Sequence, residues 1–210
     1  MSARRVGLQR AFTHAPWLTI SVCGAAWLLH AALPSPLVLA YDPRRPLLWQ
    51  ALGCHLVHFS QLHLRWDTLT FALVGAITER TARARQVWFL LAAAWLVPPA
   101  ACALSPWVTR YAGLSGLVLG QVALLLARSW RRTGDGGWWP AALLAMLYAK
   151  QLYELRLGDT SLIAMDYRGF ATVPSAHLVS VLLGTLIGAL PRRRDAREWP
   201  QTDRYRASTS

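Results

Sequence analysis

Cysteine is scarce in this sequence, and the usual motifs of a metal centre are missing. Only Cys23, Cys54 and Cys102 are present, an odd number with no CxxC spacing, and no HExxH motif occurs. A disulfide framework needs cysteines that pair, and a structural zinc site needs cysteines or histidines at regular spacing. We therefore expect no disulfide framework, no bound metal and no cofactor.

Acidic residues are also scarce: the chain has 10 of them against 22 basic residues, which gives a formal net charge of +12. Such an excess can indicate a nucleic-acid partner, but here its placement follows the joints between apolar segments. Fifteen arginines fall on one side of those segments and five on the other. Because arginine accumulates on the cytoplasmic side of membrane proteins, we expect both termini in the cytoplasm, a surrounding lipid bilayer and no nucleic-acid partner. The fifteen are Arg4, Arg5, Arg10, Arg80, Arg83, Arg85, Arg128, Arg131, Arg132, Arg192, Arg193, Arg194, Arg197, Arg204 and Arg206.

Amphipathic spacing is the third feature that the sequence lacks. The apolar residues instead form six blocks, at 17–40, 60–78, 86–104, 114–127, 138–155 and 170–190. About 20 apolar residues cross the hydrocarbon core of a bilayer, so the blocks predict an all-α membrane protein with six transmembrane helices. We expect a short basic N-terminus over 1–14, a membrane domain over 15–190 and a basic, disordered tail over 191–210. A single soluble core is the alternative.

The stretch "YAGLSGLVLG", residues 111–120, places a serine at the start of an apolar helix. The helix predicted from Leu114 to Ser129 spans about 24 Å, which is less than the hydrocarbon thickness. With its arginine-rich end at the cytoplasmic surface, Ser115 would lie below the outer surface and face a hydrated pocket. The free N–H groups of a helix start favour negative charge, which suits a serine nucleophile and the oxyanion that it creates.

A serine nucleophile needs a base within hydrogen-bond reach, and His177 is the best candidate among the six histidines. It lies one or two turns inside the outer end of the last predicted helix. In the expected topology that helix runs in the same direction as the Ser115 helix, so the two side chains reach similar depths. The alternative for His177 is a hydrogen bond to a helix carbonyl.

Small residues mark the face of the last helix that carries His177. They recur every four residues, and a position seven after His177 returns to within about 20° of its face. Small residues let membrane helices approach closely, and the Ser115 helix has a similar pair. We therefore predict that these helices pack together through Gly116, Gly120, Ser180, Gly184 and Gly188.

The segment "HLVHFSQLHLRWD", residues 55–67, concentrates His55, His58, His63 and Asp67 at the outer end of the second helix. His63 and Asp67 are four residues apart and share a helical face. Three interpretations stay open. His63 donates a hydrogen bond to the oxyanion; or His58, His63 and Asp67 bind a metal ion; or the histidines join an external loop to the helix.

Three motifs together resemble the rhomboid intramembrane serine proteases. "GLSG" at 113–116 looks like their GxSG motif, and "AH" at 176–177, with the glycines beyond, looks like their AHxxGxxxG helix. "HFSQLHLRWD" with "LVGAITE" looks like their second helix, in which a His and an Asn flank the oxyanion. The resemblance implies a rhomboid-like six-helix bundle, in which Ser115 is the nucleophile and His177 the general base and later the acid.

The resemblance also implies that His63 and the Ser115 backbone N–H hold the oxyanion, with Gly113 and Gly116 around them. The sequence departs from the family at four positions. Asp67 stands where an Asn is usual, and Ser180 replaces the first glycine of the last helix; Leu119 stands in place of an aromatic residue, and Gln50 in place of an arginine. Because an ionised Asp67 would repel an oxyanion, it must be protonated, turned away or bonded to His63.

Within that family the chain is most similar to rhombosortases, which are short, lack an extra domain and carry a segment like "AKQLYE" (149–154). This implies a bacterial inner-membrane endopeptidase, open to the periplasm, that removes the C-terminal transmembrane tail of exported proteins ending in a Gly-Gly motif, an apolar helix and a basic cluster. A general rhomboid protease of single-span substrates, a non-catalytic rhomboid-like protein that binds helices, and a metal-dependent membrane enzyme or transporter are the alternatives.

Overall fold

The computed structural model describes residues 15–133, 137–157 and 172–191, and within these ranges it is built from helices. The only β-type pairing there is an isolated bridge between Tyr41 and Tyr111. This confirms an all-α architecture. The elements are α2 (Trp17–Ala32), η1 (Pro36–Val38), α3 (Leu48–Gly53), η2 (Cys54–Leu56), α4 (Gln61–Leu104), α5 (Ser115–Thr133), α6 (Trp138–Leu157) and α7 (Pro174–Ala189).

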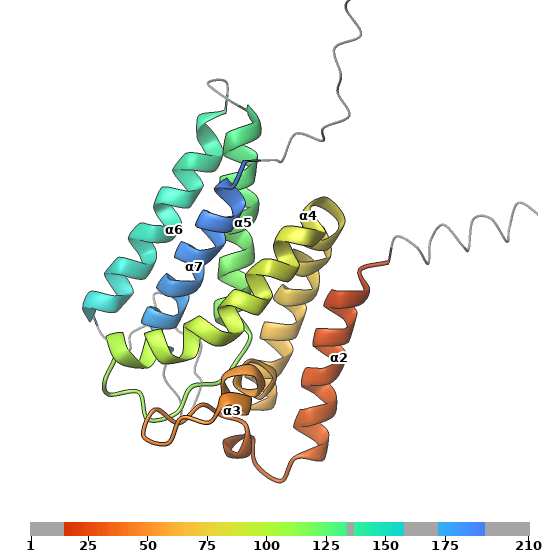
Figure 1. Cartoon of the computed structure of the whole chain (residues 1–210), viewed down its shortest axis with the longest axis vertical. Coiled ribbons are helices and arrows are strands. Elements are labelled where there is room, and N and C mark those ends of the chain that lie inside the picture. The colour runs from red at the N-terminus through yellow and green to blue at the C-terminus, as the bar shows by residue number, and fades with distance from the viewer. Residues whose placement is uncertain (1–14, 134–136, 158–171, 192–210) are drawn as a thin grey trace, which may run out of the picture.

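Helix α4 contains two of the expected blocks in 44 residues. Its backbone leaves the helical conformation at Ala82 (φ −151°, ψ 36°), and Figure 1 shows the chain reversing direction there. The two arms lie against each other, because Gln86 Nε2 donates to the Gly75 carbonyl oxygen at 3.1 Å. The same nitrogen donates to Gln121 Oε1 at 2.8 Å, which ties both arms to α5.

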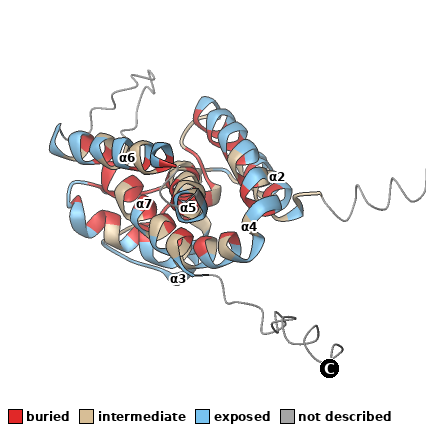
Figure 2. Cartoon of the chain, turned by 90° about the horizontal axis from the view of Figure 1, so that it is seen from above, coloured by how far each residue is buried: buried red, intermediate tan, exposed pale blue. Residues whose placement is uncertain are grey.

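Apolar side chains cover the outside of the bundle as well as its inside. Figure 2 shows buried residues facing the centre and exposed residues on the outer faces of the helices. Many of the exposed side chains are large and apolar, including Leu28, Leu73, Trp88 and Met146. A soluble protein rarely exposes so much apolar surface to water. The hydrocarbon core of a bilayer would solvate these side chains without a free-energy penalty. By length and composition α4 qualifies as a membrane span, and α2 and α7 are apolar but have 16 residues each.

Two helices differ in length from the sequence expectation. Helix α2 ends at Ala32 instead of near residue 40, because Pro34 and Pro36 follow. Helix α5 ends at Thr133, not Ser129, and its 19 residues span about 28 Å. Its C-terminal end was therefore misplaced by four residues, but its length still falls slightly short of the hydrocarbon thickness of about 30 Å.

Helices α5 and α7 form the closest pair of the bundle and run in the same direction (Figure 1). A Cβ added at Gly184 would collide with the carbonyl oxygen of Gly120, and one at Gly188 with that of Leu124. A Cβ at Gly120 would collide with the Phe89 ring of α4. The backbones are thus in contact along the face that carries Gly120, Ser180, Gly184 and Gly188.

Three acidic and basic side chains inside the helices, Lys150, Glu154 and Glu79, have polar partners. Lys150 Nζ lies 2.7 Å from Glu154 Oε2, the i, i+4 neighbour on α6. Glu79 caps α2: it accepts from the backbone N–H groups of Leu18 and Thr19 at 3.0 and 2.9 Å. Arg83 is 4.0 Å from Glu79. The polar segments 1–14 and 192–210, and most of the joint 156–170, lie outside the described residues.

Candidate active site

The loop over 105–114 leads into α5 and sets the position of Ser115. It is held in place by hydrogen bonds and is called the pinned loop below. Tyr41 and Tyr111 exchange backbone hydrogen bonds, and the Gly113 N–H donates to the Cys54 carbonyl oxygen at 2.9 Å. Beside the bridge, Asp42 pairs with Arg110. The backbone N–H of Arg44 and the Arg110 guanidinium hold the pKa of the Asp42 carboxyl below its ordinary value, so this loop pairing persists at neutral pH. Helix α5 then begins at Ser115 itself.

Ser115 and His177 lie within hydrogen-bond distance, with Ser115 Oγ 2.9 Å from His177 Nε2. His177 is in the first turn of α7, after Pro174, whose fixed φ suits a helix start. The imidazole is buried, and among the described residues its Nδ1 has no hydrogen-bond partner. For the hydroxyl to donate to Nε2, the imidazole proton must sit on Nδ1. The pair therefore has the geometry of a nucleophile and its base.

Asp67 occupies the helix start next to Ser115. A single carboxylate oxygen, Oδ2, accepts from the backbone N–H of Leu114 at 2.8 Å and from that of Ser115 at 3.1 Å. The same oxygen lies 3.1 Å from His58 Nε2 and 3.1 Å from His63 Nε2. Four nitrogens thus converge on one oxygen, which is the arrangement that binds an anion at a helix N-terminus.

Asp67 takes part in two features that the sequence analysis treated separately, namely the contact with His63 and the oxyanion site. Asp67 is bonded to His63, and it also holds the Ser115 N–H that was assigned to the oxyanion. The histidines join the external loop to α4, since His58 precedes the helix and Asp67 lies in its second turn. Sequence reasoning missed the Leu114 N–H and the full role of His58, because no spacing rule relates the loop to the start of α5.

Two glycines make this close approach possible. Gly113 has φ +120°, in the region that side chains rarely adopt, and a Cβ there would lie 2.9 Å from His63 Cε1. At Gly116 a Cβ would lie 3.0 Å from Ser180 Oγ and 3.1 Å from the Tyr111 hydroxyl. Gly113 therefore brings the loop against His63 and Asp67, and Gly116 leaves room between α5 and α7.

Comparison with known families gives one result that agrees with this arrangement. Residues 45–194 match the rhomboid domain. The chain belongs to the rhomboid family. This makes it an integral membrane protein and supports an intramembrane protease-like function, since rhomboids are generally serine hydrolases of membrane proteins. Comparison with curated proteins finds no match.

His58, His63 and Asp67 of this rhomboid could also be considered as metal ligands. One ligand atom from each lies within 4.8 Å of the others, and all three side chains are buried. Their nitrogen–oxygen separations of 3.1 Å are hydrogen-bond distances, but two ligands of one ion lie about as far apart. A metal-binding histidine almost always donates its second ring N–H to a partner, and among the described residues His58 Nδ1 has none. The lack of a partner for His58 Nδ1 is the one feature that speaks for a hydrogen-bonded network, and the absence of a metal stays a prediction.

His55, the remaining histidine of the segment, has a structural place in the rhomboid bundle. Its ring is buried and packs edge-on against Tyr111, with ring centroids 5.8 Å apart. It therefore supports the pinned loop from below and does not reach the Asp67 oxygen. A cavity of about 200 Å³ lies nearby, bounded by the end of α2 and by Val57 and His58.

Proposed function

We propose that the chain is an intramembrane serine endopeptidase in which Ser115 and His177 form a catalytic dyad. The observation that carries this proposal is the 2.9 Å contact between Ser115 Oγ and His177 Nε2 at a helix N-terminus. A serine hydroxyl is a weak nucleophile by itself, and an adjacent imidazole that accepts its proton activates it. The rhomboid match supports the same class of chemistry.

In the proposed reaction His177 Nε2 takes the proton of Ser115 Oγ as the oxygen attacks the scissile carbonyl carbon. The carbonyl oxygen becomes an oxyanion, and the adjacent backbone N–H groups of Leu114 and Ser115 are the donors that would stabilise it. His177 then gives the proton to the leaving amine, which leaves an acyl-enzyme on Ser115. Water, activated by the same imidazole, attacks the acyl carbon and releases the product acid.

This mechanism requires Asp67 Oδ2 to withdraw from the two N–H groups when substrate binds. An ionised carboxylate and an oxyanion cannot share the same donors, because like charges at that distance repel strongly. His63, which now faces Asp67, is then positioned to donate to the oxyanion. We therefore treat the described arrangement as a resting state in which the Asp67 carboxylate occupies the oxyanion site.

The proposed topology has six membrane spans with both termini in the cytoplasm. It is supported by the start of α2 and the end of α7, which lie at the same end of the bundle (Figure 1). That end carries the arginine-rich joints, as the positive-inside rule requires. The Ser115 end would then open to the periplasmic side of a bacterial inner membrane.

The proposed substrate is the C-terminal transmembrane tail of an exported protein, cleaved near a Gly-Gly motif as rhombosortases are thought to do. The resemblance of the motifs to those of rhombosortases supports this, together with the "AKQLYE" segment of α6. Glycines at the end of a substrate helix unwind readily, which would let the scissile bond reach a serine below the surface. A general rhomboid protease of other single-span proteins is the nearest alternative.

Two experiments test the proposal at different levels. A labelled fluorophosphonate should modify the purified protein covalently, and Ser115→Ala should abolish the labelling. Co-expression with a reporter that ends in a Gly-Gly, apolar-helix and arginine-cluster tail should give tail removal that depends on Ser115. Labelling without tail removal would support the serine protease and contradict the rhombosortase-type substrate. A folded protein that is not labelled would contradict the proposal that the chain is an enzyme.

A second candidate function is a non-catalytic rhomboid-like protein that binds membrane helices. The contact that favours it is the Asp67 carboxylate on the Ser115 N–H, because a permanent anion there would block an oxyanion. The fluorophosphonate experiment separates the two functions, because only an activated serine displaces fluoride from the reagent and becomes phosphonylated.

A further inference from the structure

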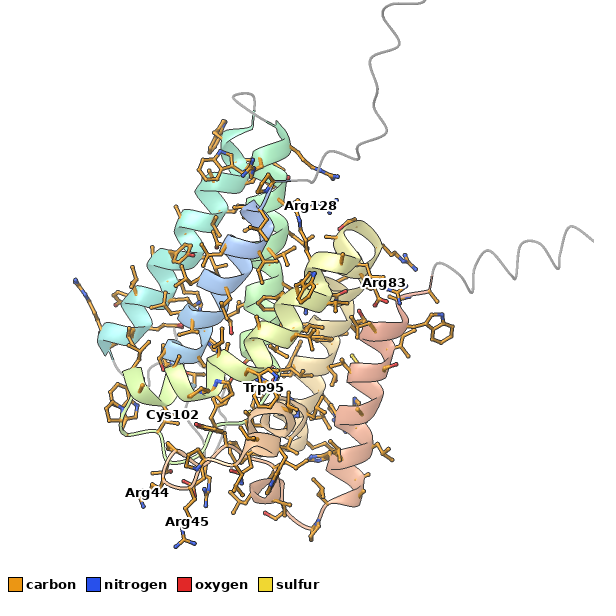
Figure 3. The ribbon with its side chains drawn as sticks, viewed as in Figure 1. Arg44, Arg45, Arg83, Trp95, Cys102 and Arg128 are labelled. Atoms are coloured by element: carbon orange, nitrogen blue, oxygen red, sulfur yellow. The ribbon has the colours of Figure 1, made fainter. Side chains whose placement is uncertain are left out.

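Two buried serines join the end of α4 to the start of α7. Ser105 is the C-cap of α4, and Ser175 lies in the first turn of α7. Ser105 Oγ is 2.8 Å from Ser175 Oγ, which is in turn 3.0 Å from the Ala101 carbonyl oxygen. Figure 3 shows Cys102, from the same last turn of α4, at the end of the bundle opposite Arg128. The link therefore lies at the end of the bundle where α5 and α7 begin.

The direction of these hydrogen bonds follows from the number of protons. Each hydroxyl carries one proton, and a carbonyl oxygen can only accept. Ser175 therefore donates to the Ala101 carbonyl oxygen and accepts from Ser105. The same carbonyl oxygen accepts from the Ser105 backbone N–H at 2.9 Å. Both serines are 0% exposed, so water does not compete for these hydroxyls, and the loss of one partner leaves a buried polar group unsatisfied.

The serine pair connects the two segments that carry the proposed dyad. Ser105 is the first residue of the pinned loop, which ends immediately before Ser115. Ser175 is two residues before His177, in the same turn of α7. One hydrogen bond thus joins the segment that positions the nucleophile to the turn that carries its base.

Other features of α7 leave its first turn less firmly held. The tight backbone contacts with α5 at Gly184 and Gly188 lie about two and three turns beyond His177. The N-cap residue, Val173, provides no side-chain hydrogen bond to the helix start. Because helix ends without such caps fray, the Ser175 hydroxyl is the side-chain anchor of this turn to α4.

We propose that Ser105 and Ser175 are positioning residues for the dyad. Their hydrogen bond holds the first turn of α7 so that His177 Nε2 stays within reach of Ser115 Oγ. An apolar pair would fill the space but let the turn slide, whereas a contact between hydroxyls is directional. A misplacement of about 1 Å can cost about a hundredfold in rate, so a smaller shift of the turn should cost about tenfold. The inference rests on the proposed function, because it concerns the alignment of that dyad.

A second hydroxyl pair on α7 offers a matched control. Tyr148 Oη donates to Thr185 Oγ1 at 3.0 Å, and Thr185 Oγ1 donates to the Val181 carbonyl oxygen at 2.8 Å. The order of donors and acceptors is the same as in the serine pair, and the contact also ties α7 to a neighbouring helix, α6. Thr185 lies about two turns beyond His177, so Tyr148→Phe should lower stability without misaligning the imidazole.

The test follows the labelling of Ser115 by a fluorophosphonate in the full chain in lipid vesicles, over a range of reagent concentrations. Ser175→Ala should lower the maximal labelling rate about tenfold and leave the half-saturating concentration unchanged, because neither hydroxyl binds the reagent. Ser105→Ala should lower the rate less, and the double variant should match Ser175→Ala, because both changes remove the same link. Tyr148→Phe should keep the rate, although it and Ser175→Ala should each lower the midpoint of thermal unfolding by about 3 °C.

Two outcomes would overturn the positioning role and leave the proposed enzyme intact. The first is an unchanged maximal rate in Ser175→Ala, and the second is equal slowing in Tyr148→Phe, which would show that the rate follows stability alone. An unmodified chain that is not labelled would instead contradict the proposed function, and the positioning role with it. Should Ser175→Ala fail to fold, the rate of Ser105→Ala decides, because that variant keeps the hydrogen bond between Ser175 and Ala101.

Discussion

The two ends of the α5–α7 pair meet charges of opposite sign. At the start of α5, the N–H groups of Leu114 and Ser115 point at the Asp67 carboxylate. At the end of α7, the carbonyl oxygens accept from Arg85 and Arg131. Both follow from the helix dipole, which favours anions at a helix start and cations at a helix end.

The difference lies in burial and in what the charge prevents. Asp67 is buried and places all four contacts on one oxygen, whereas the arginines are partly or fully exposed and spread around a cavity. A cation at a helix end only caps the helix. The anion at the α5 start caps the helix and also occupies the donors that the proposed chemistry needs.

The strongest test of the comparison is His177→Asn, which removes the base at the Ser115 end. We expect cleavage of the reporter to fall about a thousandfold, because general-base catalysis contributes gains of that order. The rate is measured with purified protein in vesicles. His30→Asn, in α2, is the control and should retain activity, because no hydrogen bond joins His30 to Ser115 or His177 among the described residues. Equal losses in the two variants would contradict the dyad.

The backbone contact between α5 and α7, which lies between the two ends, is tested by Gly184→Ala. The added Cβ would collide with the Gly120 carbonyl, so we expect destabilisation of about 1–3 kcal/mol or more. Gly24→Ala in α2 is a matched control, since nothing lies within 4 Å of its Cβ, and it should be neutral or stabilising by up to about 1 kcal/mol. Thermal unfolding in detergent measures both, and similar midpoints would show that α5 and α7 are not in backbone contact.

Replacing the buried anion sharpens the comparison at the Ser115 end. Asp67→Asn keeps the shape of the side chain but removes the negative charge from the oxyanion donors. We expect fluorophosphonate labelling of Ser115 to become about tenfold faster, because a neutral amide binds the N–H groups more weakly and does not repel the oxyanion. Slower labelling in a folded variant would show instead that the carboxylate is needed to hold His63 in place.

The smallest expected effect is at the arginine end. Arg85→Gln loses the two charge-assisted hydrogen bonds to α7, and we expect a loss of stability of about 1 kcal/mol because the site is open to water. Arg44→Gln, exposed at the other end, should change the unfolding midpoint by less. Equal changes of the unfolding midpoint in the two variants would contradict the role of Arg85 as a cap of α7.

Sequence alone predicted the helical blocks and placed Ser115 beside His177, because apolar length and small-residue spacing are local properties. It misjudged the end of α5, since Arg128, Arg131 and Arg132 were taken as a boundary although arginine is a good helix former. The joint near Ala82 likewise contains no glycine or proline, and the chain reverses direction there at a residue with non-helical φ and ψ.

The Asp67 network was beyond sequence reasoning for a different reason. The spacing of His63 and Asp67 predicted a shared face, but the contact with the Leu114 N–H depends on the +120° φ of Gly113. It also depends on how far α4 reaches along α5. These are properties of the assembled bundle, which no local pattern of residues determines.

The cap that Glu79 provides to α2 has a consequence for how the chain is made. Thr19 and Glu79 are 60 residues apart, so α2 has left the ribosome long before its partner is synthesised. Until then the N–H groups of Leu18 and Thr19 can donate hydrogen bonds only to water and lipid headgroups. We therefore expect this helix end to stay at the membrane surface. The first arm of α4 then replaces this solvent, so biogenesis itself couples the two helices as an inserted pair.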